Sequence, residues 1–253
     1  MHIYFHNAED QQRWAYTEGL NVLGQRELAV LAPWSNDDLR HRLLLNLLEF
    51  IECYIQSQPK RILPGQTFQY DWSLLRFVSD EDNISGTGSD TLLIEEQESL
   101  FAFDDVPFVP GVARTLELMQ IQHKAMQRNR VTGNVQYPFP AHFALIGSCV
   151  TPETIQQLRP LMAERYHEPE GQFSGWFIGC CDKSHDHDNP DELGKVHLMH
   201  IVKGLPALFP YIAMPIGTAL LFEEDKVVVF LPGKEQGFVD SEAHLNYSTL
   251  LSL

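Results

Sequence analysis

The stretch that decides the fold, residues 173–217, reads FSGWFIGCCDKSHDHDNPDELGKVHLMHIVKGLPALFPYIAMPIG. Its apolar run Trp176–Cys181 predicts a buried strand, and the loop Asp182–Glu192 that follows is acidic and rich in histidine. The chain then continues through Val196–Leu198 into a helical segment, and Pro215–Gly217 leads into another strand. The stretch therefore predicts buried strands and a helix around one solvated acidic loop.

Hydrophobic periodicity extends this mixture of strands and helices over the rest of the chain. Leu39–Ile55 carries apolar residues at three- and four-residue spacing, which predicts a helix with one buried face. The other expected helices are Ala8–Glu18, Val112–Met126 and one that begins at Thr151. The other expected strands are His2–His6, Glu27–Leu31, Gln66–Val78 (one or two strands), Thr91–Phe103, His142–Val150 and a hairpin of Ala219–Phe222 with Val227–Leu231.

The segment Arg130–Ala141 is the expected domain boundary. It holds Gly133, Pro138 and Pro140 and shows neither a helical nor a strand period. We therefore expect an α+β protein of two domains, residues 1–135 and residues 142–253. Each domain is expected to be a mixed or mostly antiparallel sheet packed with helices.

The charge balance restricts the class of partner. Acidic residues outnumber basic ones by 34 to 18, which gives a formal net charge of −16 at pH 7. Nucleic acid and anionic membrane surfaces would be repelled, so neither is an expected partner. A basic protein is the partner that this charge favours.

The start of the chain and its cysteines indicate the compartment. Residues 1–14 lack the basic and apolar segments of an export signal, and no apolar run approaches the ~20 residues that span a bilayer. The four cysteines, Cys53, Cys149, Cys180 and Cys181, form no Cys-x-x-Cys pair and are expected to be reduced. We therefore expect a cytoplasmic protein.

Histidines and carboxylates in the acidic loop raise the question of a metal site. His185, His187 and Asp188, with His197 nearby, could serve a metal-dependent hydrolase. Asn189 stands where a histidine would complete the two-metal pattern of one large hydrolase superfamily, so a solvated loop is the favoured interpretation. The pair Cys180-Cys181 is also interpreted as having no chemical role, because cysteines in an apolar run are usually small buried hydrophobes. We expect no catalytic residue, no metal ligand and no cofactor.

The C-terminal half resembles a known bacterial family. The resemblance rests on the strand Ala144-Leu145-Ile146, on Ser174-Gly175-Trp176, on an acidic loop ending in Asp188-Asn189-Pro190-Asp191, on Gly194-x-Val196-x-Leu198, on a helical segment centred on Pro206, and on Pro215-Ile216-Gly217. In this order, these motifs resemble the immunity protein 33 family, over residues from about Phe143 to Leu231. Members are immunity partners of bacterial polymorphic toxins, so the resemblance implies a non-catalytic binding protein.

A second resemblance covers the N-terminal half. The motif Tyr16-Thr17-x-Gly19-Leu20, followed by Glu27-Leu28, a long helix and Leu63-Pro64-Gly65, resembles a family of small uncharacterised bacterial domains. That family implies a fold and no activity.

Taken together, charge and resemblance predict an immunity protein. It would bind a basic cognate toxin domain, of the polymorphic kind or delivered by a secretion system such as type VI, and occlude its active site. The expected contact residues are Asp182, His185, Asp186, His187, Asp188, Asp191 and Glu192, and in second place Asp80, Glu81 and Asp82. Two alternatives stay open: the metal-dependent hydrolase described above and a non-catalytic adaptor of a secretion system.

Overall fold

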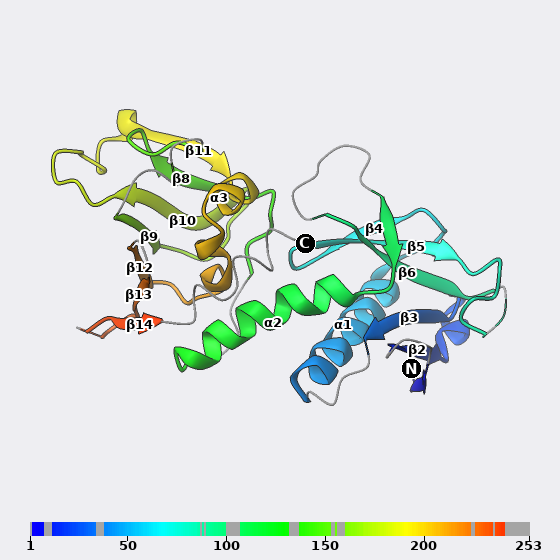
Figure 1. The fold of residues 1–253 in the computed structure, drawn as a ribbon. Coiled ribbons are helices and arrows are strands. Elements are labelled where there is room, and N and C mark those ends of the chain that lie inside the picture. Colours follow the sequence, from blue (N-terminus) through cyan, green and yellow to red (C-terminus); the bar gives the residue numbers. More distant parts are fainter. Residues whose placement is uncertain are drawn as a thin grey trace. The chain divides into compact units, whose positions relative to one another are not determined.

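The computed structural model describes residues 2–7, 12–33, 38–86, 88, 90–99, 107–131, 137–152, 155, 160–223, 226–234 and 236–240. The chain divides into two compact units, Met1–Gln120 and Ile121–Leu253 (Figure 1). Each unit contains a mixed sheet together with helices, which confirms the predicted α+β class. The predicted boundary segment, Arg130–Ala141, lies after this division and stays a prediction.

The first unit is built on a mixed sheet. Its strands are β1 (His2–Asn7), β2 (Gln12–Glu18), β3 (Leu28–Pro33), β4 (Thr67–Tyr70), β5 (Ser73–Ser79), β6 (Leu92–Gln97) and β7 (Phe108–Pro110). They follow the order β1-β2-β3-β6-β5-β4, and β7 pairs with β6. The β3–β6 pair is parallel and the other pairs are antiparallel. The predicted segment of residues 66–78 therefore forms two strands.

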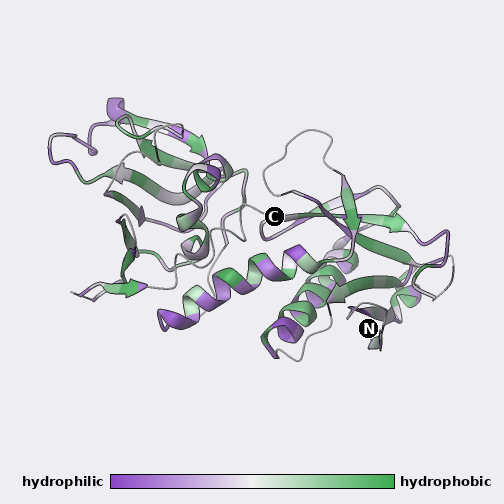
Figure 2. Ribbon diagram, in the orientation of Figure 1, coloured by the Kyte–Doolittle hydropathy of each residue, from purple (hydrophilic) through white to green (hydrophobic). Residues whose placement is uncertain are grey.

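Helix α1 (Asp38–Ser57) supplies much of the core of this unit. Its leucine and isoleucine stripe is buried, as the sequence predicts, and packs with residues of the sheet such as Val30, Phe77 and Ile94. Burying one such side chain stabilises the fold by about 1.5–3 kcal/mol. Helix α2 (Ala113–Arg128) starts in the same core through Leu116 and carries the chain into the second unit. Figure 2 shows the apolar side of α1 in green.

One prediction for this unit is wrong. Residues 12–18 form strand β2 and not the end of a helix, while residues 8–11 lie outside the described residues. β2 pairs with β1 on one side and β3 on the other, and both of its faces are covered. Ala15 enters the main core, whereas Trp14 and Tyr16 form a second cluster with Ala29. Pairing on both sides thus overrides the helical pattern of the local sequence.

The Tyr-Thr-x-Gly-Leu motif builds the connection from β2 to β3 through the 3-10 helix η1 (Leu20–Leu23). The Glu27 carboxylate accepts hydrogen bonds from the Thr17 hydroxyl (2.9 Å) and from the backbone N–H of Gly19 (2.9 Å). The Thr17 hydroxyl in turn accepts from the N–H of Leu28 (2.8 Å). Gly19 has φ 107°, a conformation that favours glycine. The threonine and the glycine of the motif are therefore explained by the geometry and hydrogen bonds of this connection.

Asp71, in the tight turn between β4 and β5, is expected to make the stability of the folded state depend on pH. Its Oδ1 is buried without a hydrogen-bond partner among the described residues, and burial raises the pKa of this carboxyl to about 7. The folded state therefore disfavours the ionised form, so stability is highest below the unfolded pKa of about 4 and falls as the pH rises to about 7.

Asp71→Asn is expected to remove this loss. It should raise the free energy of unfolding by on the order of 1–4 kcal/mol at pH 8 and change it little at pH 4. Asparagine also tolerates the positive φ of this position (49°). Urea denaturation of both proteins at the two pH values checks this, and an equal difference at both would contradict it.

The second unit contains the other mixed sheet. Its strands are β8 (Phe143–Gly147), β9 (Leu161–Arg165), β10 (Phe173–Cys180), β11 (Leu193–His197), β12 (Ala219–Phe222), β13 (Val227–Phe230) and β14 (Phe238–Asp240). They follow the order β11-β8-β10-β9-β12-β13-β14, in which the β8–β10 pair is parallel and the other pairs are antiparallel. The predicted buried strand and the predicted hairpin are confirmed.

Helical segments accompany this sheet: α3 (Leu198–Gly204) and the 3-10 helices η2 (Pro190–Glu192) and η3 (Pro206–Tyr211). The buried side chains of η3 include Leu208, Phe209 and Tyr211. The helix predicted to begin at Thr151 lies mostly outside the described residues, and strand β9, which starts at Leu161, is an element that the sequence did not predict.

The Ser-Gly-Trp motif forms an irregularity in β10. The register between β10 and β8 shifts between Phe173 and Phe177, which marks a β-bulge. Gly175 has φ 82°, and its carbonyl accepts a hydrogen bond from the N–H of Tyr166 (2.9 Å). The bulge directs Trp176 into the core, where it is 1% exposed and its indole N–H donates to the carbonyl of Ile212 (3.0 Å). The motif therefore secures the sheet to the segment that follows η3.

Candidate functional site

Two strand ends bring two cysteines together. Because β8 and β10 are parallel, their carboxyl ends lie at the same edge of the sheet. Cys180 is the last residue of β10. Cys149 lies in the turn after β8, which is closed by a hydrogen bond from the N–H of Val150 to the carbonyl of Gly147 (2.9 Å). The two sulfur atoms are 3.3 Å apart.

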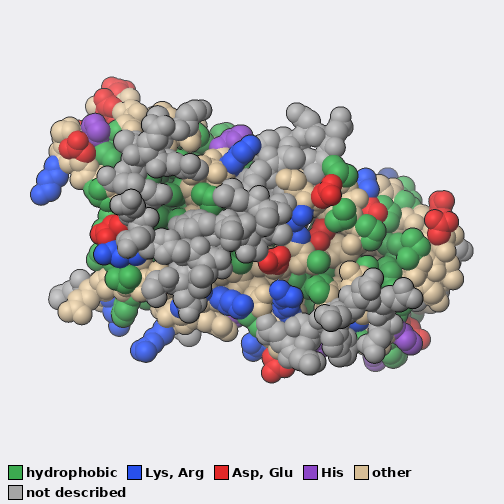
Figure 3. All heavy atoms as spheres, viewed as in Figure 1, with side chains coloured by type: hydrophobic (Ala, Val, Ile, Leu, Met, Phe, Trp, Pro, Cys, Tyr) green, Lys and Arg blue, Asp and Glu red, His purple; other side chains and the backbone are tan. Residues whose placement is uncertain are grey.

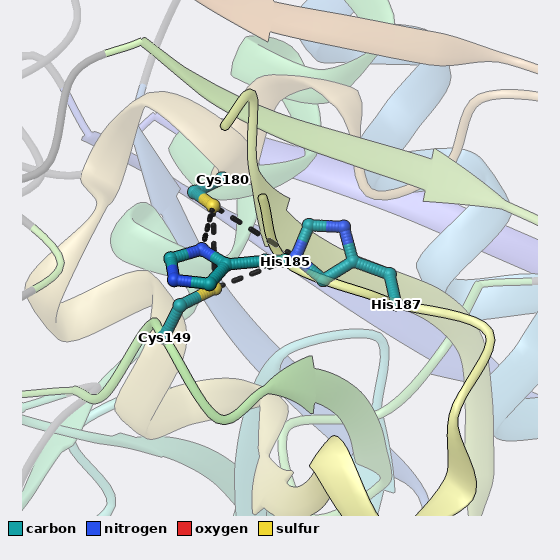
Figure 4. A group of neighbouring side chains, drawn as sticks. All are labelled: Cys149, Cys180, His185 and His187. Carbon is teal, nitrogen blue, oxygen red and sulfur yellow. Dashed lines mark hydrogen bonds between the residues drawn. The ribbon is translucent and has the colours of Figure 1, made fainter. Parts of the chain in front are cut away.

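Two histidines of the β10–β11 loop, residues Cys181–Glu192, point at these sulfurs (Figure 4). Nδ1 of His185 lies 2.8 Å from Sγ of Cys180. Nε2 of His187 lies 3.4 Å from Sγ of Cys149 and 3.8 Å from Sγ of Cys180. One ligand atom from each of the four side chains lies within 4.8 Å of the others. We call this group the Cys-His cluster.

Glycines at the strand ends leave room for the His187 ring. A Cβ atom added at Gly147 would lie 3.0 Å from Cδ2 of His187, and one added at Gly179 would lie 3.1 Å from Cε1 of the same ring. The ring also meets Phe177 edge-on, with 5.4 Å between centroids. A side chain at Gly147 would therefore crowd the His187 ring and the Cys149 sulfur (3.3 Å), and one at Gly179 would crowd the Phe177 ring (2.8 Å) as well as His187.

The cluster shifts the acidity of its own members. Burial alone raises the pKa of the Cys180 thiol, but hydrogen bonds involving His185 and the backbone at Asp182 outweigh it, and the pKa lies below its ordinary value. The same hydrogen bond to Cys180 raises the pKa of the His185 imidazole. Burial raises the pKa of Cys149. Cys180 is therefore the sulfur that more readily becomes a thiolate.

The β10–β11 loop is folded by turns of its own side chains. The carboxylate of Asp182 accepts from the N–H of Ser184 (2.9 Å), and the carboxylate of Asp186 accepts from the N–H of Asp188 (3.1 Å). The side-chain oxygen of Asn189 accepts from the N–H of Asp191 (3.1 Å) and begins η2. In such turns, side-chain oxygens supply the hydrogen bonds that the backbone N–H groups would otherwise make in a helix or a sheet.

The far end of the loop is tied to the same strand end as Cys149. The N–H of Ser148 donates to the carbonyl of Glu192 (2.6 Å), and the Ser148 hydroxyl donates to the Glu192 carboxylate. The loop is thus attached to the end of β8 at Ser148 and, through the cluster, at Cys149.

The loop presents its charges to solvent. It carries five acidic residues against the single basic residue Lys183. Figure 3 shows acidic and histidine side chains gathered over this loop, and Figure 2 shows the loop as hydrophilic. The exposed acidic side chains are Asp182, Asp186, Asp188, Asp191 and Glu192. Every contact residue predicted for this loop is exposed except His187, which is half-buried.

The second predicted contact region is arranged differently. Asp80 is buried, and its carboxylate accepts from the N–H of Ile84 (2.7 Å), the N–H of Ser85 (3.1 Å) and the hydroxyl of Ser85. This carboxylate holds the turn after β5. Glu81 and Asp82 are exposed, so any contact with a partner in this region rests on these two residues.

The structure does not bring the four residues of the hydrolase hypothesis together in one site. His185 and His187 join the Cys-His cluster, whereas Asp188 and His197 are not part of it. His197 pairs with Phe143 at the opposite end of β8 and stacks on its ring at 4.1 Å. The sequence reasoning missed Cys149, and it interpreted Cys180 as an inert hydrophobe.

Comparison with known proteins supports the resemblance that the sequence shows in its C-terminal half. Residues 122–231 match the family model of the Imm33-like domain, which confirms the resemblance to the immunity protein 33 family. A search of curated proteins and a search of solved structures gave no match. None of the described helices has the length and apolar character needed to cross a membrane. The N-terminal resemblance lies outside the matched residues and stays a prediction.

Proposed function

We propose that this protein is an immunity protein that binds a bacterial toxin domain through the β10–β11 loop and covers the toxin's active site. The match of residues 122–231 to the Imm33-like domain carries the proposal, because that domain indicates a family of immunity proteins. The loop lies entirely within the matched residues. The protein acts as one half of an effector–immunity pair, in the cytoplasm of the cell that makes it.

The charge of the loop supports a basic partner. Exposed carboxylates on one loop create a negative potential that speeds the association with a positively charged surface and disfavours partners of like charge. The net charge of −16 acts in the same direction.

The internal turns of the loop support binding in a second way. Asp182, Asp186 and Asn189 hold the backbone in local turns before any partner arrives. A loop that is already folded loses less conformational entropy on binding, so more of the contact energy appears as affinity. This arrangement requires no catalytic residue, since occlusion alone blocks a toxin.

The test neutralises the loop without unfolding it. The triple variant Asp186→Asn, Asp188→Asn and Asp191→Asn removes three charges, while asparagine at 186 keeps the oxygen that accepts from the N–H of residue 188. With a toxin domain encoded by the neighbouring gene, we expect association at low ionic strength to slow by about tenfold or more. Cells that co-express the toxin and this variant should lose protection.

A matched control changes the same number of charges elsewhere. Glu49→Gln, Glu98→Gln and Glu170→Gln are all exposed and lie outside the loop. This control should bind at close to the wild-type rate. If the two triple variants bind and protect equally, the loop is not the contact surface.

A further inference from the structure

The Cys-His cluster has the composition of a metal site. Its four ligand atoms come from two sulfurs and two imidazole nitrogens, which are the ligands that zinc prefers. Two thiolates balance the charge of one divalent ion, so a partly buried site stays neutral. Tetrahedral coordination by two sulfurs and two nitrogens is typical of zinc, whereas calcium and magnesium prefer oxygen ligands.

The distances in the cluster are close to those of a zinc tetrahedron. Bond lengths of about 2.3 Å to sulfur and about 2.0 Å to nitrogen imply edges of about 3.8 Å between two sulfurs and about 3.5 Å between sulfur and nitrogen. The sulfur–sulfur distance is 3.3 Å, three of the sulfur–nitrogen distances are 2.8, 3.4 and 3.8 Å, and all four ligand atoms lie within 4.8 Å of one another. Shifts of less than about 1 Å would bring the four atoms to one ion.

The surroundings fit the same interpretation. Gly147 and Gly179 lie against the His187 ring, within 3.0 and 3.1 Å of the position of an added Cβ atom, so the strand ends leave room for this ring beside the sulfurs. Cys149 and His187 are partly buried, Cys180 is buried and His185 is exposed. Cys53 and Cys181 are exposed and lie outside the cluster. The cluster thus differs from the other cysteines in both burial and neighbours.

We propose that Cys149, Cys180, His185 and His187 bind one zinc ion that fastens the β10–β11 loop to the ends of β8 and β10. Four protein ligands fill the tetrahedron, so the ion is structural and has no open position for a substrate. The ion joins two residues of the loop to two residues at the sheet edge. It therefore limits the motion of residues 182–187 and stabilises the second unit.

Two other arrangements of the same residues give different measurable outcomes. In a hydrogen-bonded cluster the thiols and imidazoles would bind no metal tightly. In a disulfide the sulfurs would approach to about 2.05 Å, well below the 3.3 Å seen here.

The experiment measures zinc in the full chain, purified under reducing conditions from zinc-supplemented cells with no histidine tag. Elemental analysis after dialysis should find about one zinc per chain, and Cys180→Ser and Cys149→Ser should reduce it to below about a tenth of that. Cys181→Ser and Cys53→Ser are the matched controls and should keep the ion. Cobalt substituted for zinc should give the visible absorption of a tetrahedral site with thiolate ligands.

A measurement on the wild-type protein guards against variants that fail to fold. A strong chelator should lower the melting temperature, and added zinc should restore it. Wild-type protein without zinc, equal zinc in all variants, or a Cys149–Cys180 disulfide in the reduced preparation would overturn the proposal. No toxin is needed, so this result is independent of the immunity function.

Discussion

Gly175→Ala is expected to destabilise the second unit by about 2–6 kcal/mol, because it combines backbone strain with overpacking. Gly175 has φ +82°, and a Cβ atom there would lie 1.8 Å from the backbone oxygen of His167. The oxygen belongs to the backbone, and the backbone of residue 175 fixes the position of the Cβ atom, so the two can separate only if the bulge that directs Trp176 into the core opens. Chemical denaturation followed by tryptophan fluorescence measures the loss.

Gly171→Ala separates the two causes. Gly171 also has a positive φ (+57°), but nothing lies within 4 Å of the added Cβ atom. This variant should therefore show only the strain of a left-handed conformation, about 1–2 kcal/mol. Equal losses for the two variants would mean that the contact with His167 is not what requires glycine at position 175.

Arg165→Met is expected to cost about 2–4 kcal/mol, because it leaves buried backbone carbonyls without a donor. Arg165 is fully buried and donates to the carbonyls of Ile212 (3.3 Å) and Met214, and its guanidinium also meets the Glu168 carboxylate at 2.8 Å. Methionine preserves much of the volume, so the measured loss in denaturation reflects hydrogen bonds more than a cavity.

Glu168→Gln tests which contact of Arg165 matters. The Arg165 side chain is fully buried but the Glu168 side chain is 38% exposed, and glutamine can still accept a hydrogen bond from Arg165, so the loss is expected to be smaller than that of Arg165→Met. If Glu168→Gln lost as much stability as Arg165→Met, the ion pair with Glu168, and not the hydrogen bonds to the carbonyls, would be the contact through which Arg165 stabilises the fold.

Much of the fold was predictable wherever one residue pattern determined one element. The helix α1 and the strand β10 could be predicted because the spacing of apolar residues within each segment shows which residues are buried. Strand β2 was missed because its burial comes from pairing with β1 and β3, which no local pattern reveals. Strand β9 was missed because the segment that precedes it was predicted to be a helix that begins at Thr151.

The candidate site was predictable only in part for the same reason. The sequence places His185 and His187 in one acidic loop, and the structure shows that loop exposed and folded by its own turns. Cys149 lies 31 positions before Cys180, and only the parallel pairing of β8 with β10 brings the two together. A signal was nevertheless present: each cysteine follows a glycine closely, at Gly147 and at Gly179, where a strand ends.

The most direct test of the central claim is a titration of the purified toxin domain with this protein. The account predicts that toxin activity falls in proportion to the protein added and disappears near one equivalent, with a stable complex on size-exclusion chromatography. Added salt should slow the association. Full toxin activity in the presence of excess protein, with no complex formed, would contradict the account.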